Sequence, residues 1–206
     1  MVLSENSGLP VYFVRQKLYN KMYPNRMDRA GLLCGRYLFG GCLTMFMYTD
    51  YNQHLLDNVK KIHFIGCGGS GMYPLIQILA AKGYQISGSD VLDGSIIRYE
   101  REMGVKVSLG HSADNVIGTD MVVYSAAISK DNVELNAAAS YGIPTIERSV
   151  LLGYVSRLYK QSICVSGTHG KTTTTSMITT ALELAGRDPS AVIGGKLPLI
   201  NGYGKA

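Results

Sequence analysis

The sequence of 206 residues has no tryptophan, only four cysteines and 17% charged residues. The cysteines, at positions 34, 42, 67 and 164, lack the paired spacing of a zinc site and are too few for a disulfide scaffold, so we expect a reducing, cytoplasmic setting. No run approaches the roughly 20 apolar residues of a membrane helix, so no membrane partner is expected. A hydrophobic content of 46% favours a folded chain over a disordered one.

The net charge of +5 is unevenly distributed. Residues 1–46 hold six basic and two acidic side chains, a net of +4, which leaves 14 basic and 13 acidic residues for the remainder. No stripe of Lys and Arg interleaved with aromatic residues follows residue 61. A nucleic-acid partner is therefore not expected for the folded part.

The first 46 residues show no sustained helical or alternating period. Their apolar stretch comes too late for a signal peptide, and they are poor in serine for a transit peptide, although their basic content suits one. We interpret them as a leader outside any domain and favour a translation start at Met45 or Met47.

From residue 61 onward, short apolar runs alternate with helical patterns. This alternation predicts an α/β fold with a Rossmann-like parallel sheet and helices on both faces, spanning a domain of residues 47–160. The expected strands are 62–66, 84–88, 105–109, 121–125, 144–147 and 162–166. The expected helices are 72–82, 95–103, 133–141, 150–158 and 172–185.

A glycine loop follows the first of these strands. Gly66, Gly68 and Gly71 match G-x-G-x-x-G between a strand and a helix, the setting in which backbone N–H groups bind a pyrophosphate. Asp90 ends the next strand, where a carboxylate can accept bonds from a ribose. Taken alone, the loop suggests a nicotinamide dinucleotide, or glycines that serve only a tight turn. Cys67 is interpreted as a small packed residue.

A second loop, residues 166–175, follows the strand 162–165. Its Gly-Lys-Thr-Thr centre is what a triphosphate needs, with Lys171 reaching the outer phosphates and Thr172 or Thr173 available to Mg²⁺. The strict P-loop pattern fails, because Val165 stands where its first glycine belongs. His169 is expected to shape the loop.

Two phosphate loops in one chain fit neither a dehydrogenase nor an ordinary kinase. The sequence resembles the ATP-dependent Mur ligases of peptidoglycan synthesis. The resemblance covers residues 61–206 and rests on motifs at 62–72, 87–90, 110–111, 122–128, 142–144 and 167–175.

The resemblance implies that the first loop holds the UDP of a sugar substrate rather than NAD. The implied UDP-sugar-binding residues are Gly68, Gly69, Ser70, Gly71, Met72, Asp90, His111, Ser125 and Ala126. Family members often carry a second serine where Ala126 stands. The implied ATP-binding residues are Gly167, Thr168, His169, Gly170, Lys171, Thr172 and Thr173.

Within the family, His169 and the Gly-Gly-Ser-Gly-Met run at 68–72 point to the member that joins L-alanine to UDP-N-acetylmuramate. The implied cofactors are ATP and Mg²⁺, the latter held by Thr172 and Thr173, and the carboxylate of the muramate is activated as an acyl phosphate. Lys171 is the expected catalytic residue, because it would neutralise charge on the γ-phosphoryl group. Residues 161–206 are expected to be the truncated start of a central ATP-binding domain, inactive alone.

Two alternatives remain at this point. A murein-peptide-recycling ligase shares the His169 loop, and a regulatory module could bind nucleotides without catalysis.

Overall fold

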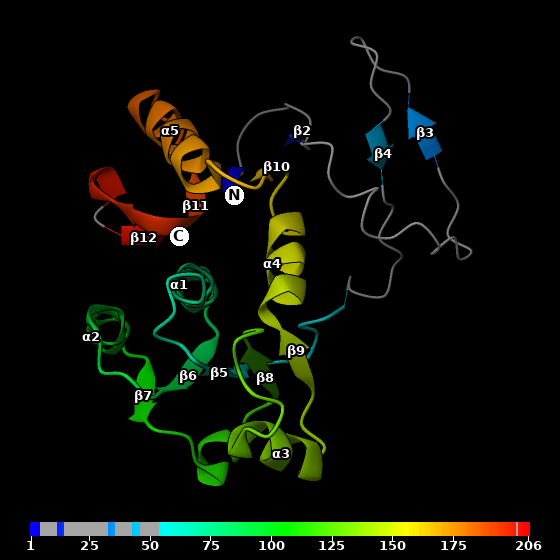
Figure 1. The fold of residues 1–206 in the computed structure, drawn as a ribbon, viewed down its shortest axis with the longest axis vertical. Helices are drawn as coiled ribbons and strands as arrows, with labels where there is room; N and C mark the ends of the chain where they lie inside the picture. Colours follow the sequence, from blue (N-terminus) through cyan, green and yellow to red (C-terminus); the bar gives the residue numbers. More distant parts are fainter. Residues whose placement is uncertain (5–11, 15–32, 36–42, 46–53, 201) are drawn as a thin grey trace. The chain divides into compact units, whose positions relative to one another are not determined.

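The computed structural model describes residues 1–4, 12–14, 33–35, 43–45, 54–200 and 202–206 (Figure 1). The chain forms two compact units, one of residues 1–15 with 58–206 and the other of residues 16–57. In the smaller unit, strands β3 (Leu33–Gly35) and β4 (Leu43–Met45) pair antiparallel. The favoured start at Met47 lies outside the described residues.

The larger unit contains the expected parallel sheet. Its five strands lie in the order β7-β6-β5-β8-β9, and every neighbouring pair is parallel, which confirms the α/β prediction. The strands are β5 (Lys61–Ile65), β6 (Gln85–Asp90), β7 (Lys106–Leu109), β8 (Met121–Tyr124) and β9 (Thr145–Glu147). Because the order reverses at β5, the loops after β5 and β8 lie on either side of the switch point where such sheets bind ligands.

Helices cover both faces of this sheet. Figure 1 shows α1 (Tyr73–Ala81) and α2 (Ser95–Glu102) on one face and α3 (Val133–Ser140) on the other. A short 3-10 helix, η3 (Ala113–Val116), packs beside α3 and was not predicted, while α4 (Arg148–Arg157) begins two residues earlier than expected. Strand β5 is buried from Ile62 to Ile65, as expected for a strand covered on both faces.

A second sheet contains β10 (Gln161–Val165), the strand that directly precedes the second loop. It combines β10 with β11 (Ser190–Leu197) and β12 (Gly202–Lys205), with η4 (Pro198–Ile200) between the last two, and α5 (Lys171–Leu184) follows β10. Strand β1 (Val2–Ser4) pairs antiparallel with β10 and β11, and β2 (Tyr12–Val14) pairs parallel with β10. Two short strands of the first 46 residues thus join this sheet, while the division at residue 160 stays a prediction.

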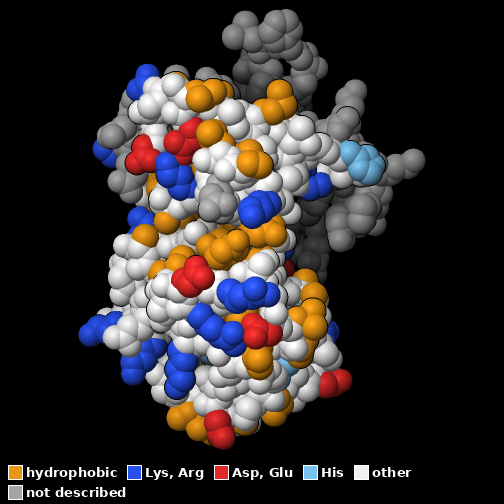
Figure 2. All heavy atoms as spheres, turned by 90° about the vertical axis from the view of Figure 1, so that its left-hand side faces the viewer, with side chains coloured by type: hydrophobic (Ala, Val, Ile, Leu, Met, Phe, Trp, Pro, Cys, Tyr) orange, Lys and Arg blue, Asp and Glu red, His pale blue; other side chains and the backbone are white. Residues whose placement is uncertain are grey.

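The surface carries charges of both signs. On the face shown in Figure 2, Lys and Arg side chains are interspersed with Asp and Glu and with hydrophobic side chains. One exposed ion pair of the described residues joins Arg101 Nη1 and Asp93 Oδ1 at 3.0 Å. Among the described residues, no helix is both long and apolar enough to cross a bilayer.

Candidate functional site

The first glycine loop runs from the end of β5 to the start of α1. Gly66 adopts a φ of 75°, a conformation that favours glycine, and its N–H donates to the Ser89 carbonyl at 2.8 Å. Within the described part of the chain, the N–H groups of Ser70 and Gly71 have no hydrogen-bond partner. Two free donors beside the first turn of α1 suit an anionic oxygen.

Asp90 is tied to the same loop. Its Oδ2 accepts from the Gly68 N–H at 3.0 Å, and its Oδ1 accepts from the Leu92 N–H at 3.0 Å. A Cβ on Gly68 would stand 3.0 Å from Asp90 Oδ2 and 3.1 Å from Ile97 Cδ1, so glycine is needed there for close approach. The predicted ribose-binding carboxylate therefore also holds the loop in shape.

Arg148, which sequence reasoning missed, reaches the glycine loop from α4. A Cβ on Gly71 would collide with Arg148 Nη1 and stand 3.1 Å from Cζ, so the guanidinium lies directly over the loop. The side chain is half-buried and, among the described residues, has neither a hydrogen bond nor an ion pair. Its sequence signal was its place as the first residue after β9, at the ligand-binding edge.

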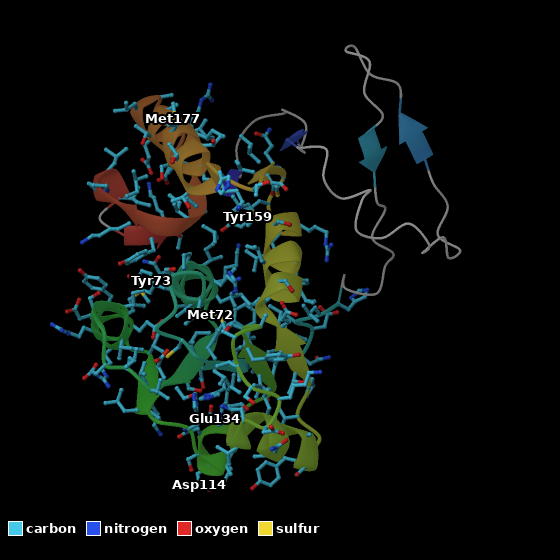
Figure 3. All side chains as sticks on the ribbon, viewed as in Figure 1. Met72, Tyr73, Asp114, Glu134, Tyr159 and Met177 are labelled. Carbon is cyan, nitrogen blue, oxygen red and sulfur yellow. The ribbon has the colours of Figure 1, made fainter. Side chains whose placement is uncertain are left out.

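The other residues predicted for this ligand lie around the loop with differing exposure. Figure 3 shows Met72 at the start of α1; its side chain is buried and its N–H donates to the Gly69 carbonyl at 2.8 Å. Ser125 follows β8 and its hydroxyl accepts from the Ala127 N–H at 3.3 Å, while Ala126 is exposed. The Ser125 loop thus lies at the carboxyl edge of the sheet, and its contact with a ligand stays a prediction.

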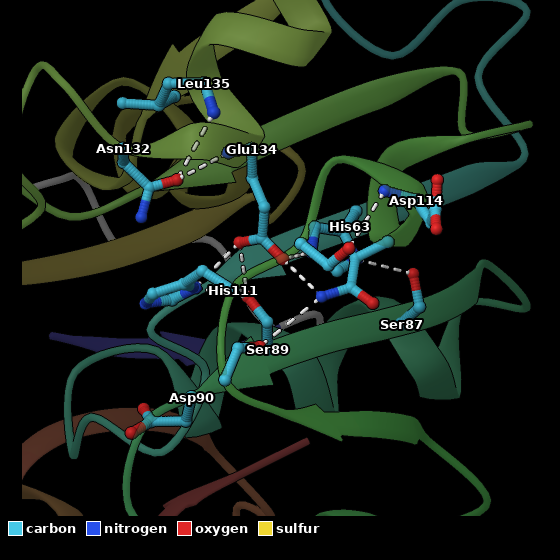
Figure 4. Close-up of polar contacts among 12 residues, drawn as sticks. His63, Ser87, Ser89, Asp90, His111, Asp114, Asn132, Glu134 and Leu135 are labelled. Atoms are coloured by element: carbon cyan, nitrogen blue, oxygen red, sulfur yellow. Dashed lines mark hydrogen bonds and ion pairs between the residues drawn. The ribbon is translucent and has the colours of Figure 1, made fainter.

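His111 belongs to a buried polar network that the sequence did not reveal (Figure 4). Its Nδ1 lies 2.9 Å from Glu134 Oε2 and 3.1 Å from Ser89 Oγ. Glu134 also accepts from Ser89 Oγ at 2.6 Å and from Asn115 Nδ2 at 2.6 Å. Side chains from β6, from η3 and from the loop after β7 therefore meet at one carboxylate of α3.

Glu134 is completely buried, between α3 and the sheet (Figure 3). Burial by itself raises the pKa of its carboxyl, but the polar contacts with His63, Ser89 and Asn115 outweigh burial and lower the pKa from 4.5 to about 2. Neither Lys nor Arg takes part in its described contacts. A signal existed in the sequence, because Gln85, Ser87 and Ser89 place polar side chains at alternate positions, on one face of this strand.

The depressed pKa of Glu134 gives the protein a pH-dependent stability. A folded-state pKa of about 2 below an unfolded value of 4.5 stabilises the fold fully above pH 4.5, and that stability is lost as the pH falls from 4.5 towards 2. We expect Glu134→Gln to reduce the free energy of unfolding at pH 7 by up to about 3 kcal/mol. In urea titrations the difference between the two proteins should narrow in acid; a difference independent of pH would contradict the assignment.

The second loop joins β10 to α5. Gly170 adopts a φ of 79° and caps α5, which begins at Lys171. Lys171 Nζ donates to the carbonyl oxygens of Gly167 at 2.5 Å and Thr168 at 3.2 Å, so the ammonium lies over the loop. His169, Thr172 and Thr173 are exposed. These groups fit a triphosphate, because a helix N-terminus and an ammonium converge on one exposed loop.

Thr172 lies against the glycine pair of β11. Its Oγ1 would be 3.3 Å from a Cβ on Gly194, and its Cγ2 3.1 Å from one on Gly195. In the described residues, no three His, Cys, Asp or Glu side chains gather as a metal site.

Residues 61–160 match the family described as Mur ligase family, catalytic domain. Over 147 residues the chain is 46% identical to the UDP-N-acetylmuramate–L-alanine ligase of Caldanaerobacter subterraneus subsp. tengcongensis, covering 71% of this chain and 32% of that protein. Over 139 residues it is 50% identical to the ligase of the same name from Sulfurihydrogenibium, covering 68% and 30%. The chain thus spans about a third of the length of these curated relatives.

Solved structures give the same fold. The UDP-N-acetylmuramate-alanine ligase of Thermotoga maritima superposes with a TM-score of 0.67 at 31% identity, covering 70% of this chain and 34% of that one. The UDP-N-acetylmuramate:L-alanyl-gamma-D-glutamyl-meso-diaminopimelate ligase of Neisseria meningitides superposes with a TM-score of 0.66 at 30% identity, covering 71% and 46%. The names of both proteins contain UDP-N-acetylmuramate, and they differ in the second substrate.

Proposed function

The chain belongs to the Mur ligase family, and we propose that it binds UDP-N-acetylmuramate at its first glycine loop and ATP with Mg²⁺ at its second. The whole reaction is the ATP-dependent joining of L-alanine to the lactyl carboxylate of the sugar, in the cytoplasm. Residues 58–160 supply the UDP-sugar site, and residues 161–206 supply the phosphate loop of the ATP site.

The observation that carries the first half of this proposal is the anion site at the switch point. Among the described residues, the N–H groups of Ser70 and Gly71 and the guanidinium of Arg148, which lies against Gly71, have no hydrogen-bond partner. Three donors, one of them positively charged, suit a diphosphate better than a neutral ligand. Similarity to ligases named for UDP-N-acetylmuramate supports that ligand over NAD.

The second half rests on the loop around Lys171. ATP, when bound, would supply the phosphoryl group that activates the sugar carboxylate. Lys171 would leave its two carbonyl partners and place its ammonium against the outer phosphates, where charge develops during transfer. The hydroxyls of Thr172 and Thr173 would hold Mg²⁺ against the same phosphates.

Isothermal titration of the chain with UDP-N-acetylmuramate, UDP and NAD tests the first loop. We expect heat from the two uridine nucleotides and none from NAD. Binding of NAD alone would overturn the proposal. In the protein that carries this chain, release of phosphate from ATP should require both UDP-N-acetylmuramate and L-alanine.

A recycling ligase is the second candidate, because the Neisseria structure superposes almost as well as the Thermotoga one. Both readings require the same sugar nucleotide, so the second substrate separates them. Phosphate release with L-alanine but not with L-alanyl-γ-D-glutamyl-meso-diaminopimelate supports the alanine ligase. The reverse preference supports the recycling enzyme.

Replacing Arg148 with alanine should weaken binding of UDP-N-acetylmuramate. Loss of a charge-assisted contact of about 1.5–3 kcal/mol corresponds to a rise of about 10- to 100-fold in Kd. Titration calorimetry measures it, and Arg101→Ala is the matched control because Arg101 pairs with Asp93 on the surface. Equal affinity of Arg148→Ala and the unmodified chain would remove Arg148 from the site.

A further inference from the structure

The polar contacts of Glu134 with Ser89, His111 and Asn115 indicate a role that the proposed function does not assign. We infer that Glu134 is a positioning residue, which fixes the imidazole of His111 so that its Nε2 faces the nucleoside half of the bound UDP-sugar. This inference rests on the proposed UDP-sugar site, and it adds a residue that lies too deep to touch the ligand itself.

The hydrogen bonds around Glu134 determine which ring nitrogen of His111 carries the proton. The low pKa of Glu134 leaves its carboxylate ionised, and a carboxylate only accepts. Ser89 has one hydroxyl proton, which it donates to Glu134 Oε2 at 2.6 Å. The ring nitrogen 2.9 Å from the same oxygen must therefore be the donor, so His111 Nδ1 carries hydrogen.

The opposite ring nitrogen is then left for another partner. Among the described residues, His111 Nε2 takes part in no hydrogen bond, and the side chain is 20% exposed. A neutral ring would accept there, and an imidazolium would donate. Either form is held in one orientation, because Glu134 and Ser89 bind the other side of the ring.

His63 faces the same carboxylate from β5. Its Nδ1 bonds Ser87 Oγ at 2.9 Å, and its Nε2 lies 3.6 Å from Glu134 Oε1 with no hydrogen-bond partner in the described residues. His63 is buried and cannot reach a ligand at the sheet edge. Of the two imidazoles that face Glu134, only that of His111 is partly exposed, so only His111 can connect Glu134 to a bound ligand.

The order of the strands places His111 relative to the ligand. Gly110 donates its N–H to the Asp90 carbonyl at 2.8 Å, so His111 lies at the carboxyl edge beside the end of β6. Along this edge come the glycine loop after β5, Asp90 at the end of β6 and His111 after β7. A diphosphate on the loop directs its nucleoside across β6 in sheets of this order, towards β7. A ribose hydroxyl or a uracil carbonyl is therefore the group that meets Nε2.

The test compares Glu134→Gln, His111→Ala and their double variant in the full chain, by titration with UDP and with UDP-N-acetylmuramate. We expect each single variant to raise both Kd values about 5- to 30-fold, since a lost hydrogen bond is worth about 1–2 kcal/mol. The double variant should bind no more weakly than His111→Ala, because Glu134 acts through His111. A loss confined to UDP-N-acetylmuramate, or additive losses, would overturn the inference.

The ¹⁵N spectrum of the His111 ring gives a readout that general destabilisation would not move. In the free chain, we expect hydrogen on Nδ1, and a shift of the tautomer or of its pH profile in Glu134→Gln. Glu100→Gln is the matched control, because Glu100 is also fully buried but, among the described residues, neither of its carboxylate oxygens has a hydrogen-bond partner. It should leave the His111 signals unchanged.

Two provisions keep the test decisive. If Glu134→Gln does not fold, Ser89→Ala removes one bond to the same carboxylate oxygen and should shift the His111 signals in the same direction. Unaltered signals in a folded variant would overturn the inference. If the unmodified chain binds neither uridine nucleotide, the proposed function fails, whereas the tautomer measured without ligand still tests the link between Glu134 and His111.

Discussion

Lys171→Ala is expected to reduce ATP turnover by at least about 100- to 1,000-fold in the protein that carries this chain, the range seen when one preorganised group facing transition-state charge is removed. The Kd for UDP-N-acetylmuramate should change by less than about twofold, since the two sites lie on different sheets. Phosphate release and titration calorimetry measure the two effects. Lys171→Arg should also fail, because a planar guanidinium does not replace a compact ammonium.

The control for Lys171 is another exposed lysine near the same strand. Lys160 directly precedes β10 and is also exposed, so Lys160→Ala removes the same charge without touching the loop. It should keep full turnover. Turnover retained in Lys171→Ala would refute the role given to this residue, and loss of UDP-N-acetylmuramate binding would show that the substitution acts on the fold.

The parallel sheet was predictable because local signals agreed with one another. Strand β5 and the loop after it combine a run of buried residues with glycines whose spacing has one structural solution. The boundaries of the strands and helices predicted between residues 62 and 185 were correct to within two residues, and the end of β6 and the start of α4 differ most. The elements η3, β11, η4 and β12 had no predicted bounds. Consistent propensity, periodicity and turn chemistry leave little for tertiary contacts to override.

The parts that escaped prediction depend on contacts between distant segments. Glu134 and Asn115 are ordinary polar residues in sequence, and only the packing of α3 against η3 brings them to His111. Arg148 lies 77 positions beyond Gly71, and only the fold brings its guanidinium to the glycine loop. Strands β1 and β2 lack any period of their own and form by pairing with β10.

Gly88→Val is expected to cost about 3 kcal/mol or more of the free energy of unfolding, because overpacking a buried strand is destabilising. Gly88 lies in the middle of β6, in register with Phe64 of β5 and Val107 of β7. A Cβ there would stand 2.7 Å from both Cβ and Sγ of Cys67 and 3.2 Å from the Phe64 carbonyl oxygen. Cys67 is fully buried within the glycine loop, so the loop itself would have to move.

The same displacement should abolish binding of UDP-N-acetylmuramate even under conditions where the variant is folded, because the Cys67 N–H bond to the Ser89 carbonyl at 3.1 Å helps to hold the loop. Gly88→Ala should give a smaller loss of about 1–3 kcal/mol, and the matched control Gly94→Ala, where a Cβ meets nothing within 4 Å, should cost less than about 0.5 kcal/mol. Urea unfolding measures the series. Equal stability of Gly88→Val and Gly94→Ala would mean that Cys67 is not packed tightly against Gly88. In that case Cys67 would not connect the stability of the sheet to the shape of the nucleotide loop.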